Sequence, residues 1–213
     1  MGRGTVWVAI LIRGLLDRVD PRTNALAGRP FPLPFSPSVL SARDLALWAG
    51  SEFPQRLARV DTRTGDLRRT FRPPRDPVAV AAGDDGTAWF AQGEEVPFGR
   101  VPVEGDDLDL DADTEGDGSL DVAVGPRGAV YVLLDTDTDT YTYTDNDTGN
   151  QGSKTVSFRP VVRVDPRTGD VISRARVGDE ARALAAGEGA AWVVERATGD
   201  VPSGSWRLTR ARP

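Results

Sequence analysis

Two reactive residue types are missing from this chain, because its 213 residues include no cysteine and no histidine. Without cysteine there is no disulfide and no thiol nucleophile. Without histidine the chain lacks the commonest general acid–base group and the commonest metal ligand. Ser-His-Asp and Cys-His catalytic arrangements are therefore excluded within the chain. A pair of carboxylates, as in glycoside hydrolases, remains available for catalysis, but no spacing in the sequence singles out such a pair.

Long apolar segments are missing too. The longest run, Val6 to Leu16, is too short to span a bilayer and contains Arg13 and Gly14. It also lacks the basic start and the small-residue cleavage site of a signal peptide. The sequence therefore predicts no membrane span and leaves the localisation open. We expect an extracytoplasmic location only if the chain is a fragment of an exported protein.

Basic residues are absent from two stretches of the chain. Residues 104–121 hold nine acidic side chains and residues 135–147 hold five, with no basic residue in either stretch. The net charge of −6 is thus the sum of −14 in these stretches and +8 elsewhere. The arginines of the remainder are spread along the chain without a dense cluster, and the acidic stretches would repel phosphate. We therefore expect no nucleic-acid partner.

What the sequence does contain is a repeat with a period of 41 residues. The aromatic series is Trp7, Trp48 and Trp89, continued by Tyr131 and Trp192. The second series is Arg18-Val19, Arg59-Val60, Arg100-Val101 and Arg163-Val164, with Arg207-Leu208 as its last member. An insertion of about 20 residues between Leu134 and Val161 explains the one wider gap. We expect the aromatic residues to lie in the core, one in each strand B.

Each unit is predicted to form four short antiparallel strands, A to D. The turn from C to D is Asp61-Thr-Arg-Thr-Gly65 in the second unit and Asp165-Pro-Arg-Thr-Gly169 in the fourth. Asp caps its own backbone in such a turn, and Gly supplies the positive φ at its end. The first unit has Asn24 at that last position, and Asn is the non-glycine residue that best tolerates a left-handed conformation.

A period near 40 with four strands per unit is typical of a β-propeller. The fold class we predict is all-β, with five blades of four-stranded antiparallel sheet, of which the first and last are incomplete. The single domain, 1–213, then divides into blades at approximately 1–35, 36–75, 76–116, 117–177 and 178–213, with an inserted hairpin at 135–160.

The turn Val164-Asp-Pro-Arg-Thr-Gly-Asp170, followed by Val171-Ile-Ser-Arg-Ala-Arg-Val-Gly178, resembles the YVTN repeat. The segment Ala186-Gly-Glu-Gly-Ala-Ala-Trp192 resembles the broader group that contains virginiamycin B lyase-like propellers. The resemblance covers nearly the whole chain, and it implies a propeller fold. It also implies a bacterial origin and a lyase-like chemistry, but the chemistry of those enzymes depends on a histidine that this chain lacks.

The two ends of the repeat are incomplete. Residues 1–7 align without gaps to residues 186–192, so we expect the first blade to lack the body of its strand A. The last blade stops at Pro213, just after a strand C. We therefore expect an open arc from a larger propeller, with the chain a fragment of a larger bacterial protein. A closed five-bladed ring is the alternative, and the unpaired terminal blades would also allow a homo-oligomer.

Three kinds of site follow from this fold. The loops from strand D to the next strand A face the side from which ligands usually enter a propeller channel. The residues they offer are Ser36, Arg75, Asp76, Ser119, Asp179 and Glu180. The Asp/Thr-rich hairpin is either a partner-binding arm or a tolerated surface insertion, and the second reading is slightly favoured.

The acidic stretch is a candidate calcium site. Its proposed ligands are Asp111, Asp113, Glu115 and Asp117. The spacing matches the start of an EF-hand loop, but Val122 stands where that loop needs a bidentate Glu. A solvated acidic strand D and loop is the alternative, and we expect no other cofactor.

The function we predict is a non-catalytic propeller module that acts as a scaffold or a sensor-like binding domain for an unknown protein or small ligand. The alternative is a carboxylate-dependent hydrolase or lyase-like enzyme that acts in the central channel. The absence of histidine and cysteine favours the first of these.

Overall fold

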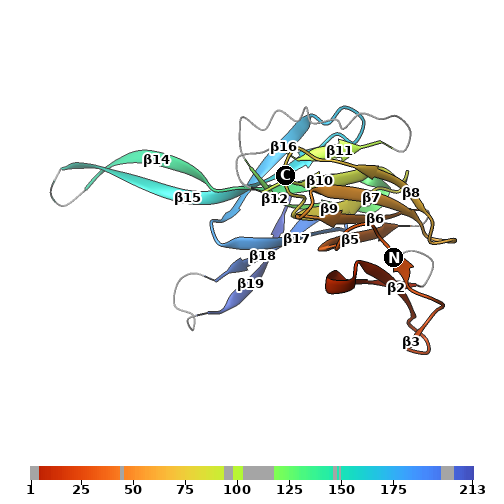
Figure 1. The fold of residues 1–213 in the computed structure, drawn as a ribbon. Coiled ribbons are helices and arrows are strands. Elements are labelled where there is room, and N and C mark those ends of the chain that lie inside the picture. Colours follow the sequence, from red (N-terminus) through yellow and green to blue (C-terminus); the bar gives the residue numbers. More distant parts are fainter. Residues whose placement is uncertain are drawn as a thin grey trace.

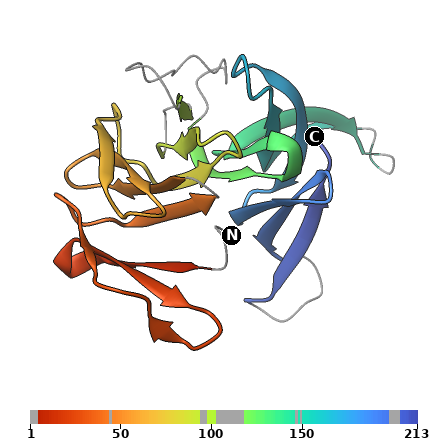
Figure 2. The same ribbon diagram turned by 90° about the vertical axis from the view of Figure 1, so that its right-hand side faces the viewer.

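The computed structural model describes residues 5–43, 46–93, 98–102, 118–145, 148, 150–197 and 204–213. In this part of the chain the structure consists of antiparallel β-strands and two single 3-10 turns, η1 (Leu11–Arg13) and η2 (Pro126–Gly128), with no α-helix. The strands form five separate sheets. Figure 2 shows these sheets arranged side by side around a common axis, which is the arrangement of a β-propeller. The predicted fold class is therefore confirmed.

Each sheet is one blade, and in blades 2, 3 and 5 the described strands pair in chain order. Blade 1 holds β1 (Val6–Ile10), β2 (Leu15–Asp20), β3 (Ala25–Leu26) and β4 (Phe31–Pro32). Blade 2 holds β5 (Val39–Arg43), β6 (Ala46–Ser51), β7 (Arg56–Asp61) and β8 (Leu67–Phe71). Blade 3 holds β9 (Ala79–Ala82), β10 (Ala88–Ala91) and β11 (Gly99–Val101).

The last two blades have a different make-up. Blade 4 holds β12 (Ser119–Val124), β13 (Val130–Leu134), β14 (Asp137–Thr144), β15 (Gln151–Val164) and β16 (Val171–Gly178). Blade 5 holds β17 (Ala181–Gly187), β18 (Ala190–Arg196) and β19 (Trp206–Ala211). In blade 1 both β3 and β4 pair with β2, so that two short pieces replace one outer strand. The first described strand of blade 1 is β1, which carries Trp7 and pairs with β2.

The two sequence markers are cross-strand partners in every blade. Within each sheet the aromatic residue of the second repeat strand lies directly opposite the arginine of the third. The pairs are Trp7 with Arg18, Trp48 with Arg59, Trp89 with Arg100, Tyr131 with Arg163 and Trp192 with Arg210. The guanidinium lies over the aromatic ring in blades 1, 3 and 5, at 5.9, 5.6 and 5.3 Å from the centroid.

One member of the second series was assigned wrongly from the sequence. The arginine opposite Trp192 is Arg210, whereas Arg207 pairs with Glu195 and lies on the other face of the sheet. Arg207-Leu208 and Arg210-Ala211 both fit an Arg–apolar pattern. Because side chains alternate between the two faces of a strand, residues three apart lie on opposite faces, and only the pairing with Trp192 shows which arginine belongs to the series.

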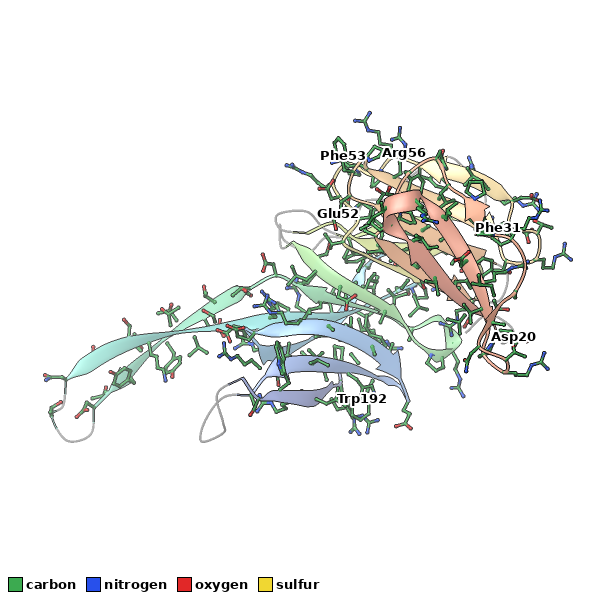
Figure 3. The ribbon with its side chains drawn as sticks, turned by 60° about the horizontal axis from the view of Figure 1, so that its bottom comes forward. Asp20, Phe31, Glu52, Phe53, Arg56 and Trp192 are labelled. Atoms are coloured by element: carbon green, nitrogen blue, oxygen red, sulfur yellow. The ribbon has the colours of Figure 1, made fainter. Side chains whose placement is uncertain are left out.

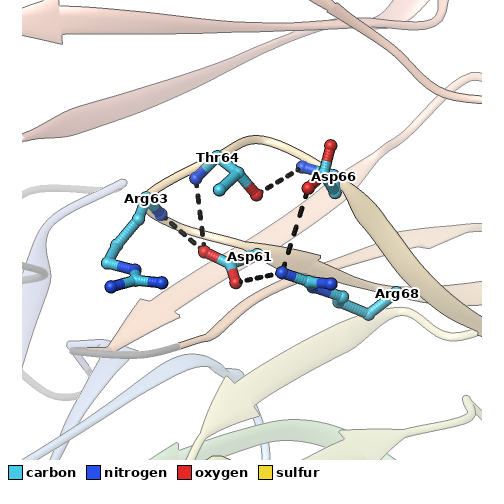
Figure 4. Close-up of polar contacts among 5 residues, drawn as sticks. All are labelled: Asp61, Arg63, Thr64, Asp66 and Arg68. Atoms are coloured by element: carbon cyan, nitrogen blue, oxygen red, sulfur yellow. Dashed lines mark hydrogen bonds and ion pairs between the residues drawn. The ribbon is translucent and has the colours of Figure 1, made fainter.

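The C-to-D turns have the geometry that their residues predict. In blade 2 the Asp61 carboxylate accepts hydrogen bonds from the backbone amides of Arg63 (2.8 Å) and Thr64 (3.3 Å), and from the Arg68 guanidinium at 2.7 Å (Figure 4). Gly65 closes the turn at φ 78°. A Cβ at Gly65 would lie 1.8 Å from the Phe31 ring of blade 1, so glycine is needed both for the backbone and for the contact between blades.

Consecutive blades pack face to face in one repeated way. We call the face that carries the aromatic residue and its arginine the aromatic face, and the opposite face the receiving face. Trp7 of blade 1 packs with Leu47 and Val60 on the receiving face of blade 2. The same contact joins Trp48 to the face of Phe90 in blade 3, Trp89 to the face of Val132 in blade 4 and Tyr131 to the face of Val193 in blade 5. The core thus consists of four interfaces between neighbouring sheets.

The segment expected as an inserted hairpin contains β14 and the outer part of β15. These strands pair from Asp137 with Phe158 to Thr144 with Gln151. Figure 1 shows them as a long ribbon that extends away from the rest of the molecule. The inner part of β15 remains in the blade, where it pairs with β13 and β16.

Candidate interaction surfaces

The inner strands enclose a cavity of about 420 Å³ near the propeller axis, lined by β5, β9 and β12 together with Ala186. Its lining residues are small or apolar apart from Ser41 and Arg43, and they include no carboxylate. Arg43 donates to the carbonyl oxygens of Val124 (2.9 Å) and Gly125 (3.4 Å) and forms an ion pair with Asp84. This arginine therefore joins blades 2, 3 and 4 across the end of the cavity.

Two further cavities lie between neighbouring blades. The first, of about 290 Å³, is lined by Trp89 and Arg100 of blade 3 and by Arg127 and Arg167 of blade 4, among others. Arg100 donates to the Arg167 carbonyl oxygen at 3.0 Å, which holds the two blades together. The second, of about 260 Å³, is lined by Tyr131 and its partner strand. Both cavities lie beside the paired aromatic residue and arginine of a blade.

The six predicted ligand-face residues line none of these three cavities. Arg75, Asp76 and Asp179 are exposed and Ser36 is half-buried. Glu180 forms an ion pair with Arg182 at 3.2 Å. The structure gives these residues no common pocket, and a role in ligand binding stays a prediction.

Ser119 differs from the other five because it is fully buried. Its hydroxyl accepts a hydrogen bond from the Gln92 amide at 2.9 Å, and its backbone exchanges two hydrogen bonds with Gly93. Ser119 therefore links the start of blade 4 to blade 3, which is a structural role. The four predicted calcium ligands, Asp111, Asp113, Glu115 and Asp117, lie outside the described residues, and that site also stays a prediction.

Two carboxylates that are partly or wholly buried were missed by the sequence analysis. Asp121 accepts hydrogen bonds from the amides of Leu184 (2.7 Å) and Val122 (2.8 Å), and burial raises the pKa of this carboxyl. Because Leu184 belongs to blade 5, Asp121 joins the inner strands of blades 4 and 5. Burial disfavours the charged form of Asp121, and the two hydrogen bonds that its carboxylate accepts partly offset this effect.

Glu195 is the second buried carboxylate, with 1% of its surface exposed. It accepts hydrogen bonds from the Gly178 amide, the Thr209 hydroxyl and the Arg207 guanidinium. Burial alone would raise the pKa of Glu195, but these hydrogen bonds outweigh burial and lower it. Ala191, Val193 and Glu195 alternate along β18 and lie on the receiving face. An acid in line with two apolar residues of a strand could have identified Glu195 from the sequence.

The hairpin presents two chemically different faces. One carries threonine and serine side chains, such as Thr140 and Thr155, whose hydroxyls lie 2.8 Å apart. The other carries the exposed rings of Tyr141 and Tyr143, and Tyr143 covers Gly152 on the opposite strand. In the described part of the ribbon beyond Phe158, β14 and β15 pair only with each other, so both backbone edges are open.

Loops at the same end of blades 1 and 2 expose apolar side chains. Phe53 lies beside Glu52 and Arg56 on the loop between β6 and β7 (Figure 3), and 91% of its surface is exposed. Ile12, on the corresponding loop between β1 and β2, is 95% exposed. Exposed aromatic and branched side chains at loop tips are common contacts in protein interfaces.

Blade 5 leaves its aromatic face open. The residue two positions before the paired arginine is fully buried in blade 1 (Leu16) and in blade 2 (Leu57), but Leu208 at the same position of blade 5 is 62% exposed. Val194 and Trp206 on this face are also exposed, and Trp192 is half-buried (Figure 3). The aromatic face of blade 5 is therefore an exposed apolar surface, whereas the equivalent face of each preceding blade is covered by the next blade.

Blade 1 leaves its receiving face open. Val6 and Val8 flank Trp7 and are 47% and 41% exposed. The residues at the same positions in blade 2, Leu47 and Ala49, are fully buried. Figure 2 shows that blades 1 and 5 are neighbours around the axis and are set apart from each other, and the described strands of the two blades do not pair.

No protein-family model and no curated protein matches this sequence. Solved structures do match the fold. Hydrazine synthase from Kuenenia stuttgartiensis aligns with a TM-score of 0.69 and 14% identity, over 97% of this chain and 62% of its own. The WD40 repeats of RRP9 align with a TM-score of 0.64 and 11% identity, over 96% of this chain and 58% of their own. Virginiamycin B lyase from Staphylococcus aureus aligns with a TM-score of 0.50 and 12% identity, over 89% of this chain and 73% of its own.

These likenesses establish the class of protein, which is a β-propeller, and their low identity supports no narrower family. The chain spans about 60% of the length of hydrazine synthase and of the RRP9 repeats that it matches. In the described part of the chain no helix is both long and apolar enough to cross a membrane.

Proposed function

We propose that this protein is a non-catalytic β-propeller module that binds another protein and serves as a scaffold. The observation that carries the proposal is the pair of open blade faces, with Leu208 exposed on blade 5 and Val6 on blade 1. Apolar side chains that are buried at the same repeat positions elsewhere in the chain are typical of an interface. Exposed Phe53 and Tyr141 add two smaller apolar surfaces on a loop and on the hairpin.

The neighbours in structure are consistent with such a role. They include the RRP9 WD40 repeats and a propeller of the Mitotic Checkpoint Complex, which is an assembly by name. Within the β-propellers we propose a place for this chain among bacterial YVTN and virginiamycin B lyase-like repeats, because the turn of residues 164–170 resembles the first and the segment of residues 186–192 resembles the second. Among the described residues, the lining of the 420 Å³ cavity holds no carboxylate that could form the acid pair of the alternative enzyme.

Affinity capture with the full chain tests the proposal. The wild type is compared with a Leu208→Asp variant, which places a charge on the open face of blade 5, and with Arg174→Asp, which changes an exposed side chain of blade 4. We expect the wild type and the blade 4 variant to retain the same proteins, identified by mass spectrometry, and Leu208→Asp to lose them. Equal capture by all three would contradict the proposal, as would turnover in a glycosidase or lyase screen.

The predicted homo-oligomer through the terminal blades is the alternative form of this binding role, and it has a separate test. Sedimentation equilibrium at several concentrations gives the mass of the wild type and of Leu208→Asp. A mass above that of one chain (22.9 kDa) that falls to one chain in the variant would show self-association through blade 5.

A further inference from the structure

We infer that the partner is a protein that presents one further four-stranded blade of the same kind, which docks between the open faces of blades 5 and 1. This inference rests on the proposed function and names its partner. The docked sheet would turn a receiving face to Trp192 and Leu208 and an aromatic face to Val6 and Val8.

The four interfaces within the chain are the templates for this docking. In each of them an aromatic face meets branched or small apolar side chains, as Trp48 meets Val80 and Val101. In its second and third strands blade 5 retains the paired residues of that aromatic face, with Arg210 over Trp192 at 5.3 Å and Leu208 opposite Val194. A surface that repeats these positions of the internal interfaces fits the same kind of sheet that those interfaces bury.

The receiving face of blade 1 adds a charge requirement. Asp17 lies opposite Val8, in the middle of that face, and is half-buried. The same position holds Ala58 in blade 2, Gly99 in blade 3 and Val162 in blade 4, all uncharged and buried. A carboxylate covered by an apolar sheet must be paired, so the partner's aromatic face needs a basic side chain opposite Asp17. This requirement distinguishes the expected partner from an exact copy of an internal blade.

A whole second copy in the same orientation fits this place poorly. Figure 2 shows the five blades surrounding most of the axis and leaving one gap, between blades 5 and 1. A copy that continued the blade series from blade 5 would bring five more blades into a space smaller than five blades, and it would overlap blade 1. A partner that supplies a single blade avoids that overlap.

The test uses the protein's own blade 2 as the probe, because that blade has both faces. Residues 36–75 are joined through a flexible Gly/Ser linker to Pro213 of a full chain that carries Asp17→Ala, because a copy of an internal blade is not expected to pair that carboxylate, and the unextended Asp17→Ala chain is the reference. We expect the melting temperature to rise by about 4 °C or more, tryptophan emission to shift to shorter wavelength, and binding of the dye ANS to fall, because the open faces become covered.

The matched control carries Leu47→Asp and Val60→Asp in the added blade only, which destroys its receiving face. This control should melt at the temperature of the unextended chain. A gain of equal size with both added blades, or no gain with either, would overturn the inference.

A second experiment separates this inference from the proposed function. That experiment is the sedimentation equilibrium of the unextended chain. If the wild type is a dimer and Leu208→Asp is a monomer, a second copy covers the open faces. The inference of a single-blade partner is then wrong, while a binding role stands. If affinity capture fails but the added blade stabilises the chain, the docking geometry stands and the proposed partner binding is wrong.

Discussion

At the scale of single residues, this protein uses its charged side chains to connect strands and turns. Asp61 closes a turn, Arg43 joins three blades, and Glu195 joins blade 5 to the end of β16 through Gly178. Asp121 and Glu195 accept two and three hydrogen bonds and line none of the three cavities described above. Their shifted pKa values reflect structure, so they do not by themselves indicate catalysis.

Removing Glu195 should destabilise the protein strongly. Glu195→Ala leaves the Gly178 amide and the Thr209 hydroxyl without their acceptor, and we expect a loss of about 2–4 kcal/mol in the free energy of unfolding. Urea titration measures the loss. The control is Glu180→Ala, whose side chain is 41% exposed and forms a single surface ion pair, and which should change stability by less than about 0.5 kcal/mol. Equal effects would show that burial of Glu195 is unimportant.

The turn acid Asp61 should make stability depend on acid. The hydrogen bond from Arg68, with those from the Arg63 and Thr64 amides, lowers the pKa of Asp61 from 3.8 to about 2. A carboxyl whose pKa is lower in the folded state contributes stability that is present above about pH 4 and is lost as the pH falls toward 2. Urea unfolding between pH 2 and 6 should show a flatter dependence in Asp61→Asn than in the wild type. Parallel curves would contradict this reading.

At the scale of elements, tight hairpins set the geometry of each blade, and one of them contains an unfavourable residue. Arg127 has φ 63° and ψ 23°, and Gly128 has φ 74°, which is the conformation of a two-residue turn with positive φ at both central positions. Glu188 and Gly189 adopt the same signs of φ between β17 and β18. Arginine and glutamate tolerate this region less well than asparagine or glycine.

Replacing the strained residue should stabilise the protein. We expect Arg127→Asn to raise the free energy of unfolding by about 0.5–1 kcal/mol, because Asn adopts the left-handed region at lower cost. Thermal and urea unfolding measure the gain. Arg127→Ala is the control, since it removes the same side chain and keeps the backbone penalty. A similar gain from Ala would assign the effect to the arginine side chain.

The hairpin should be dispensable for folding. Thr138 and Ser157 are cross-strand partners, so replacing residues 139–156 by Asn-Gly joins them through a two-residue turn. The shortened chain keeps the blade part of β15, and we expect its melting temperature to change by less than about 3 °C. A large loss would show that the ribbon supports the blade. Unchanged stability with lost protein capture would identify the hairpin as a binding arm.

At the scale of the whole molecule, five similar sheets give one row of interfaces with two open ends. Because the sheets repeat, residues at the same position of different blades can be compared directly. Where the residue type is also the same, a difference in exposed surface shows whether a neighbouring blade covers that position. Leu57 and Leu208 occupy the same position, and only the first has a blade packed over it.

This pair gives a matched prediction. Leu57→Ala should cost about 2–5 kcal/mol of unfolding free energy, because it creates a cavity in a buried interface. Leu208→Ala should cost less than about 0.5 kcal/mol in the isolated chain, because its side chain is 62% exposed. Urea titration of both variants is the measurement. A large cost for Leu208→Ala would mean that this face is already covered in solution.

The sequence by itself determined the repeat, the turns and the strand faces of this protein. Asp61 and Gly65 specify their turn by local chemistry, and the aromatic series at a fixed period specifies one sheet after another, because these preferences act within a few residues. The fold class could therefore be predicted before any coordinates.

The tertiary structure alone decided which residues meet across blades. Arg210 could be told from Arg207 only by its pairing with Trp192, because the loop before β19 breaks the regular spacing. Glu195 and Asp121 each gained one partner from a neighbouring blade, the Gly178 amide and the Leu184 amide respectively. The sequence predicted unpaired terminal blades, but it could not show which side chains they leave exposed, since Leu57 and Leu208 are the same residue and burial depends on what lies opposite the residue in space.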